Sequence, residues 1–65
     1  MKFEIITGVK RQDGIIVLWQ EQQQMKSMFF EYGDLIDQKI NALDLLDHPK
    51  MYRLDPESHT ITMGS

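Results

Sequence analysis

The sequence predicts an α+β fold made of a small antiparallel β-meander, one amphipathic helix and a C-terminal β-hairpin. Three observations lead to this fold class. Apolar and charged residues alternate over residues 2–10, residues 15–19 form an apolar run rich in β-branched side chains, and apolar residues recur at helical spacing over residues 34–47. A chain of 65 residues has room for one domain, so we expect a single domain over residues 1–65.

The first two strands of the meander are expected at residues 2–10 and 14–20. Alternation of apolar and polar side chains is typical of a half-buried strand, and it runs through the first segment. Asp13 and Gly14 form a hairpin turn signal between the two apolar runs. The run at residues 15–19 is apolar on both faces, which favours a central strand with cover on each side.

Residues 20–32 fit two structures. One is a third strand at residues 26–32, which would give the apolar second strand a neighbour. The other is a helix that ends at Gly33, with an apolar stripe made of Met25, Met28, Phe29 and Tyr32. Aromatic residues favour strands, so we expect the strand and keep the helix as the alternative.

The amphipathic helix is expected at residues 34–47. Its apolar residues fall in one broad stripe, Asp34 stands where an N-cap belongs, and Pro49 follows its end. Beyond it, two runs that favour strands flank an Asp-Pro turn signal. They predict a hairpin with arms at residues 51–55 and 59–63.

Composition excludes several kinds of site. The chain has no cysteine, so it has neither a disulfide framework nor a thiolate metal site. His48 and His59 lack the spacing of zinc ligands, and no nucleophile or glycine-rich phosphate motif is present. We therefore expect no metal, no cofactor and no enzymatic activity. The lack of a signal-peptide pattern and of a long apolar run favours a cytoplasmic location.

An uncovered apolar sheet face is the first candidate functional surface. One helix covers only one face of a three-stranded sheet, and the sequence leaves open which face that is. The other face would then be a protein interface, and a symmetric homodimer is the simplest way to cover it. The side chains expected at this interface are Trp19, Met28, Phe29, Phe30 and Tyr32.

Segregated charge is the second candidate surface. The formal net charge is −3 at pH 7, and residues 31–47 contain five acids against the single base Lys39. The acidic helix face consists of Asp34, Asp37, Asp44 and Asp47. Such a face steers a basic partner, or imitates a row of phosphates and occupies a basic groove, or is simply a solvated helix face.

A nucleic-acid interface is the remaining alternative. A net acidic chain lacks the basic footprint that nucleic-acid binders usually have, so nucleic acid is not the expected partner. A basic and aromatic sheet face would nevertheless consist of Lys2, Lys10, Arg11, Lys26, Trp19 and Phe29.

The sequence therefore predicts a small cytoplasmic accessory protein without catalytic activity. We expect it to act by binding another protein, with a homodimer as the expected assembly and no membrane contact. The two alternatives are an acidic mimic of nucleic acid and a small nucleic-acid-binding module. A short, acidic, cysteine-free chain is also common among regulatory and mobile-element proteins.

Overall fold

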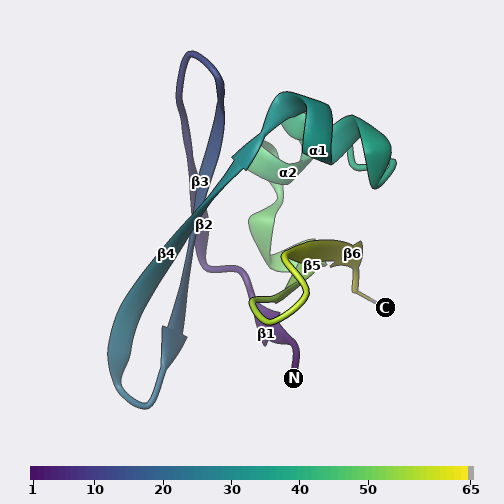
Figure 1. Cartoon of the computed structure of the whole chain (residues 1–65). Helices are drawn as coiled ribbons and strands as arrows, with labels where there is room; N and C mark the ends of the chain where they lie inside the picture. The colour runs from purple at the N-terminus through teal and green to yellow at the C-terminus, as the bar shows by residue number, and fades with distance from the viewer. Residues whose placement is uncertain (65) are drawn as a thin grey trace.

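Two three-stranded antiparallel sheets and two short helices share one core in the computed structural model, which describes residues 1–64 (Figure 1). The strand order is β1-β5-β6 in one sheet and β2-β3-β4 in the other. Both helices and the sheet β1-β5-β6 lie on the same side of the long hairpin β3–β4 (Figure 1). The elements are β1 Phe3–Glu4, β2 Thr7–Lys10, β3 Gly14–Glu21, β4 Gln24–Glu31, α1 Tyr32–Asp37, α2 Ala42–Asp47, the 3-10 turn Pro49–Met51, β5 Tyr52–Asp55 and β6 Thr60–Met63.

The strand predicted at residues 2–10 is two strands that belong to different sheets, so this prediction is wrong. The chain bends at Ile5 and Ile6, between β1 and β2. The Ile5 N–H donates to the Tyr52 carbonyl oxygen at 3.4 Å, and the Ile6 N–H donates to the Leu18 carbonyl oxygen at 2.9 Å. The alternation continues through the bend, but only its first half points apolar side chains at the core. Ile5 is buried there, whereas Val9 points to the side of the sheet β2-β3-β4 that faces away from the core.

The hairpin β3–β4 confirms the second strand and decides the ambiguous segment in favour of a strand. Its register runs without interruption from Gly14 opposite Glu31 to Glu21 opposite Gln24. β4 therefore begins two positions before the predicted residue 26 and ends one position before residue 32. The turn residues Gln22 and Gln23 have φ of 53° and 67°, the positive values that a tight two-residue hairpin turn needs.

The helix predicted at residues 34–47 is two helices of six residues each. α1 begins at Tyr32, so Asp34 is not its N-cap. Lys39 takes a left-handed conformation with φ of 61°, which ends the first helix. The Asn41 side chain then accepts a hydrogen bond from the Asp44 N–H and caps the second. A local side-chain cap of this kind competes with a continuous helix, and the apolar spacing alone does not reveal it.

The C-terminal hairpin is confirmed, with arms slightly shorter than predicted. Met51 belongs to the 3-10 turn, and His59 lies in the connecting turn with φ of 55°. Gln38, just after α1, holds this hairpin in place. Its side-chain Nε2 donates to the His59 carbonyl oxygen at 3.3 Å, and its Oε1 accepts from the Ile61 N–H at 2.7 Å.

The core lies between the inner faces of the two sheets and the two helices. Side chains from both sheets and both helices are fully or almost fully buried there: Ile5, Ile15, Val17, Trp19, Phe30, Leu35, Leu45, Tyr52, Leu54 and Ile61. The covered face of β3 is therefore the one that carries Ile15, Val17 and Trp19, which decides the question that the sequence leaves open. No helix within residues 1–64 is long and apolar enough to cross a membrane.

Gly14 gives the first testable prediction. A Cβ at this buried position would press on the Phe30 carbonyl oxygen and lie 2.9 Å from both Glu31 Cα and Phe29 Cζ. Since backbone cannot yield easily, we expect Gly14→Ala to lower the free energy of unfolding by about 1–3 kcal/mol, measured by urea denaturation.

Gly33→Ala is the matched control for this substitution. A Cβ there meets nothing within 4 Å, and the residue lies inside α1. Alanine should raise the stability by about 0.5–1 kcal/mol, because glycine is a poor helix former. Equal effects of the two substitutions would contradict the crowding at Gly14.

Candidate protein-binding surface

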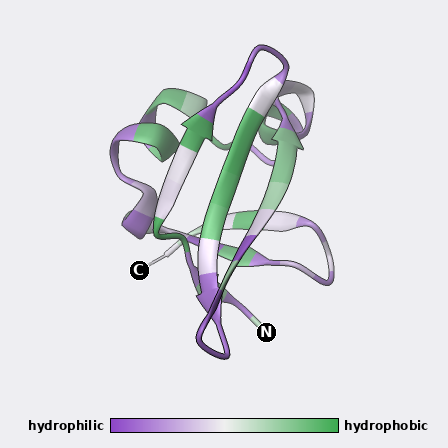
Figure 2. Cartoon of the chain, turned by 90° about the vertical axis from the view of Figure 1, so that its left-hand side faces the viewer, coloured by the Kyte–Doolittle hydropathy of each residue, from purple (hydrophilic) through white to green (hydrophobic). Residues whose placement is uncertain are grey.

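The side of the sheet β2-β3-β4 that faces away from the core is apolar and uncovered. We call it the outer sheet face, and its apolar side chains are Val9, Ile16, Leu18, Met25 and Phe29. Figure 2 looks onto this side, and no helix or strand lies in front of the central green strand. Val9 is 42% exposed, Phe29 40% and Met25 55%. Monomeric proteins rarely leave such a surface open to water.

Strand register explains why these side chains gather. Residues opposite each other in an antiparallel pair point to the same face. Val9 lies opposite Ile16, and Ile16 lies opposite Phe29, so the three form one row across the sheet. Leu18 and Met25 share this face because side chains alternate along each strand.

The outer sheet face carries almost no charge. Its remaining strand positions are Thr7, Gln20 and Ser27, and Glu31 stands at its end. By contrast, the outer face of the sheet β1-β5-β6 is polar, with the Arg53 guanidinium 3.9 Å from the Glu4 carboxylate. The sheet β1-β5-β6 therefore has an ordinary solvated outer face, whereas the sheet β2-β3-β4 has an apolar one.

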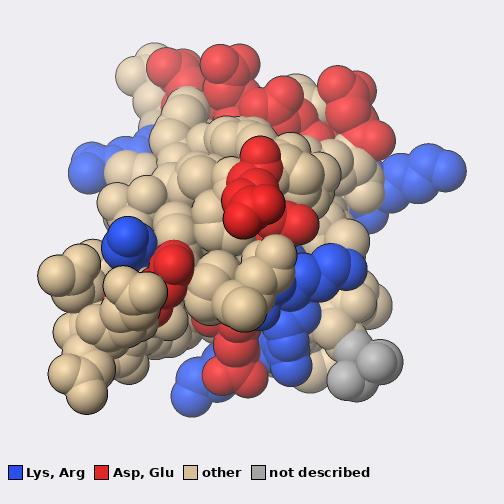
Figure 3. Space-filling view, turned by 60° about the horizontal axis from the view of Figure 1, so that its bottom comes forward, with Lys and Arg blue, Asp and Glu red and all other residues tan. Residues whose placement is uncertain are grey.

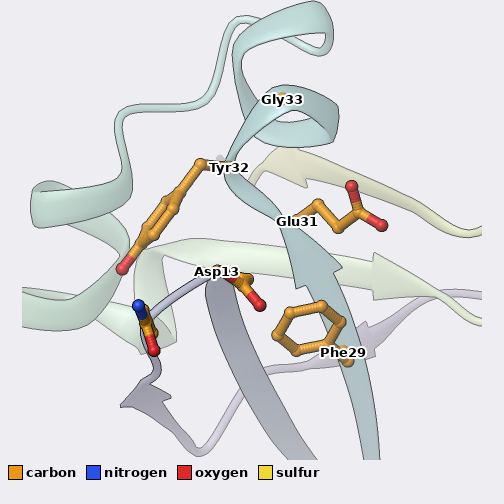
Figure 4. Close-up of a pocket in the computed structure, with 6 residues that line it drawn as sticks. Asp13, Phe29, Glu31, Tyr32 and Gly33 are labelled. Atoms are coloured by element: carbon orange, nitrogen blue, oxygen red, sulfur yellow. The ribbon is translucent and has the colours of Figure 1, made fainter.

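A shallow hollow of about 450 Å³ lies at the end of the outer sheet face. We call it the acidic hollow, and it is lined by Gln12, Asp13, Phe29, Glu31, Tyr32 and Gly33 (Figure 4). The Tyr32 hydroxyl donates to the Arg11 carbonyl oxygen at 2.9 Å, which fixes one wall. Within residues 1–64, neither Asp13 nor Glu31 forms an ion pair. Two free carboxylates beside an aromatic ring suit a guanidinium or ammonium group.

The predicted aromatic interface divides between the two faces of the sheet. Trp19 and Phe30 are 3% and 0% exposed, so both belong to the core and neither is accessible to a partner. They lie on the inner face, where the Trp19 ring stands 6.4 Å from that of Phe3. Met28 is half-buried against the same core. Phe29 alone points outward from this set, and Tyr32 lines the acidic hollow.

The set of interface residues predicted from the sequence omits Val9 and Met25, which belong to the exposed surface. The signal that could have found them is parity along the strands. Met25 lies four residues before Phe29 on the same strand and therefore on the same face, and Val9 is linked to Phe29 through the central Ile16.

The four predicted acids do not form one row along a helix. Asp34 and Asp37 belong to α1, whereas Asp44 and Asp47 belong to α2. The Asp34 carboxylate lies 4.0 Å from the His59 Nε2 atom, and the Asp44 carboxylate accepts a hydrogen bond from the Tyr52 hydroxyl. Figure 3 shows acidic side chains along the upper edge of one molecular face, with basic side chains at its flanks and lower side.

No group of three or more histidine, aspartate or glutamate side chains within residues 1–64 is arranged to hold a metal ion. His59 instead stacks on Phe30, with ring centroids 4.1 Å apart. His48 forms the junction between α2 and the following 3-10 turn, and its N–H donates to the Asp44 carbonyl oxygen at 2.8 Å.

The contact between Tyr52 and Asp44 gives a prediction about alkaline pH. Burial of the phenol, together with its hydrogen bond to the Asp44 carboxylate and the charge of that carboxylate, raises the pKa of Tyr52 from 10.0 to about 12. The unfolded chain releases this proton near the ordinary pKa, whereas the folded chain holds it. Stability therefore falls as the pH rises from about 10 to about 12.

Urea unfolding between pH 9 and 12 checks this prediction. The free energy of unfolding of Tyr52→Phe should fall less steeply across that window than that of the original chain, because phenylalanine has no proton to release. Parallel pH profiles for the two proteins would show that Tyr52 is not the group responsible.

Comparison with known proteins adds no relative. No family model, no curated protein and no solved structure matches this chain. What the chain does must therefore be argued from its own side chains.

Proposed function

We propose that this chain is a small, non-catalytic protein-binding module. Its partner carries an apolar surface patch with an arginine or lysine beside the patch. The patch covers the outer sheet face, and the basic side chain enters the acidic hollow. The observation that carries this proposal is the uncovered apolar face of the sheet β2-β3-β4.

The apolar part of the contact supplies the affinity. Phe29 and Met25 are the most prominent side chains, and aromatic and methionine residues are enriched at protein interfaces. Complete burial of one such side chain contributes about 1.5–3 kcal/mol, so the exposed parts of both contribute a fraction of that. Ile16 and Leu18 lie half-buried between them and form the base of the contact surface.

The acidic part of the contact supplies orientation. A guanidinium in the hollow would reach the carboxylates of Asp13 and Glu31 while its plane stacks on the Phe29 ring. The net charge of −3 attracts a basic partner over a longer range. These features together favour a partner that is apolar with a basic rim.

The two nucleic-acid alternatives have less support. Lys10 and Lys26 lie opposite Ile15 and Trp19, so both point to the inner side of the sheet and away from the outer sheet face. The exposed aromatic ring of Phe29 therefore has no neighbouring strand cation on its face. The acids of the two short helices are divided between separate elements and partly engaged with Tyr52, which is unlike a regular row of phosphates.

Selection from a random peptide library displayed on phage tests the proposal. We expect the selected peptides to combine large apolar residues with arginine or lysine. Phe29→Ser should weaken the best peptide at least tenfold in calorimetry, because it removes the exposed ring. Glu31→Gln should weaken it several-fold at low salt and less at high salt, since exposed charges are screened.

Ile36→Ser is the matched control, because Ile36 is an exposed apolar residue on α1, 72% accessible and outside the outer sheet face. It should leave peptide binding unchanged, with circular dichroism confirming that all variants fold. Selected peptides that bind Phe29→Ser as tightly as the original chain would overturn the proposal.

A further inference from the structure

Within residues 1–64, strand β4 is a long sheet edge that pairs with β3 on one side and with no strand on the other. It is the outermost strand of the sheet β2-β3-β4, with eight residues and no bulge in its pairing to β3. The other edges are shorter, since β1 has two residues and β2 and β6 have four each. In β6, the Ile61 N–H is already bonded to Gln38. Long unprotected edges are the places where natural proteins add a further strand.

The register identifies which backbone groups of β4 are free. The Tyr32 N–H donates to the Asp13 carbonyl oxygen at 3.2 Å, at the end of the β3–β4 ladder. Antiparallel ladder bonds alternate, so every second residue before Tyr32 also bonds to β3. The N–H and C=O groups that point away from β3 belong to Met25, Ser27, Phe29 and Glu31. The Glu31 carbonyl oxygen accepts the first hydrogen bond of α1, because Glu31 is the N-cap of that helix. The other outward groups take part in none of the backbone hydrogen bonds found outside the helices and strands of residues 1–64.

We propose that two copies of this chain pair through β4, antiparallel, around a two-fold axis at Ser27. Each Ser27 then lies opposite Ser27 of the second copy, and Met25 lies opposite Phe29 of the second copy. The pairing uses outward backbone groups only, so both internal ladders stay intact. It stands independently of the partner binding proposed above.

Side-chain chemistry selects this register. The opposed Met25 and Phe29 make two sulfur–aromatic contacts across the axis, which are favourable. Lys26 lies opposite Met28 of the second copy, and Glu31 lies opposite Gln23, so no like charges are directly opposed. An axis at Lys26 would oppose two ammonium groups, and an axis at Met28 would oppose Met25 to Glu31. Both alternatives lose the contacts between Met25 of one copy and Phe29 of the other.

The pairing joins two sheets into one of six strands. A two-fold axis perpendicular to the sheet keeps both outer sheet faces on the same side. Phe29 and Met25, which are exposed at the edge of one copy, come to lie at the centre of the joined face. Two acidic hollows then stand at symmetric positions on a single binding surface.

Ser27→Cys is the direct test of this arrangement. Directly opposed, hydrogen-bonded residues have Cα atoms about 5.5 Å apart, within the range of about 4.4–6.8 Å that a disulfide spans. The chain has no cysteine of its own, so a disulfide formed by this variant must join two copies. In the presence of oxidised glutathione, with the protein at micromolar concentration, we expect most of the Ser27→Cys variant to become a covalent dimer.

Ser58→Cys is the matched control, because Ser58 is exposed in the turn between β5 and β6, on the other sheet. It should cross-link at least tenfold more slowly than Ser27→Cys. Equal cross-linking rates for the two variants would overturn the pairing.

Sedimentation equilibrium provides a second, non-covalent measurement. The original chain should show a concentration-dependent dimer mass. Ser27→Pro should be monomeric with unchanged circular dichroism, because the Ser27 N–H points away from β3 and an edge strand tolerates proline there. A monomeric original chain at millimolar concentration, or a dimer that Ser27→Pro leaves intact, would overturn the pairing.

The two proposals fail separately. A monomer that still binds apolar, basic peptides overturns the strand pairing alone. A β4-paired dimer that selects no such peptides overturns the proposed partner binding alone.

Discussion

The crossing at Ile5 and Ile6 holds the two sheets of this molecule together. Consecutive backbone N–H groups bond to different sheets there, one to Tyr52 and the next to Leu18. The Ile5 side chain is fully buried where these sheets meet. Without this bend, β1 could not pair with β5 while β2 pairs with β3, and the C-terminal hairpin would lose its place against the core.

The crossing also determines which surface is left open. It directs both the second sheet and the helices onto one side of β3, so every covering element lies against Ile15 and Val17. The opposite side of β3 carries Ile16 and Leu18, and residues 1–64 contain no further element to cover it. Because β3 is apolar on both faces and is covered on only one, its uncovered face becomes part of the outer sheet face.

The sequence predicts the strands better than it predicts their partners. The apolar run of β3 and the aromatic character of β4 are local signals, and both strands are where those signals indicate. The bend at Ile5 is invisible to alternation, because apolar and polar residues alternate on both sides of it although Ile5 points into the core and Val9 points away from it. The division of the helix depends on the Asn41 side chain and on the backbone of Lys39, which apolar spacing does not record.

The candidate site shows the same limit of sequence reasoning. Neighbouring residues on β4 point to opposite faces, so Phe29 and Phe30 have opposite environments although their types are identical. Only tertiary packing decides which of the two is exposed. The acidic hollow is harder still, since Asp13 and Glu31 are far apart in the sequence and meet only because Gly14 lies opposite Glu31.

The tight turns of this chain use residues other than glycine at left-handed positions, so the chain can be stabilised further by substitution. No described glycine has positive φ, whereas Gln22, Gln23, Lys39 and His59 do. A left-handed conformation costs an ordinary residue about 1–2 kcal/mol, and asparagine or glycine relieves much of that cost. In the proposed pairing Gln23 lies opposite Glu31 of the second copy, and the His59 ring stacks on Phe30, whereas Lys39 lies outside both proposed contact surfaces. Substitution of Lys39 by asparagine or glycine can therefore make the molecule more heat-resistant while both of its proposed contact surfaces stay as they are.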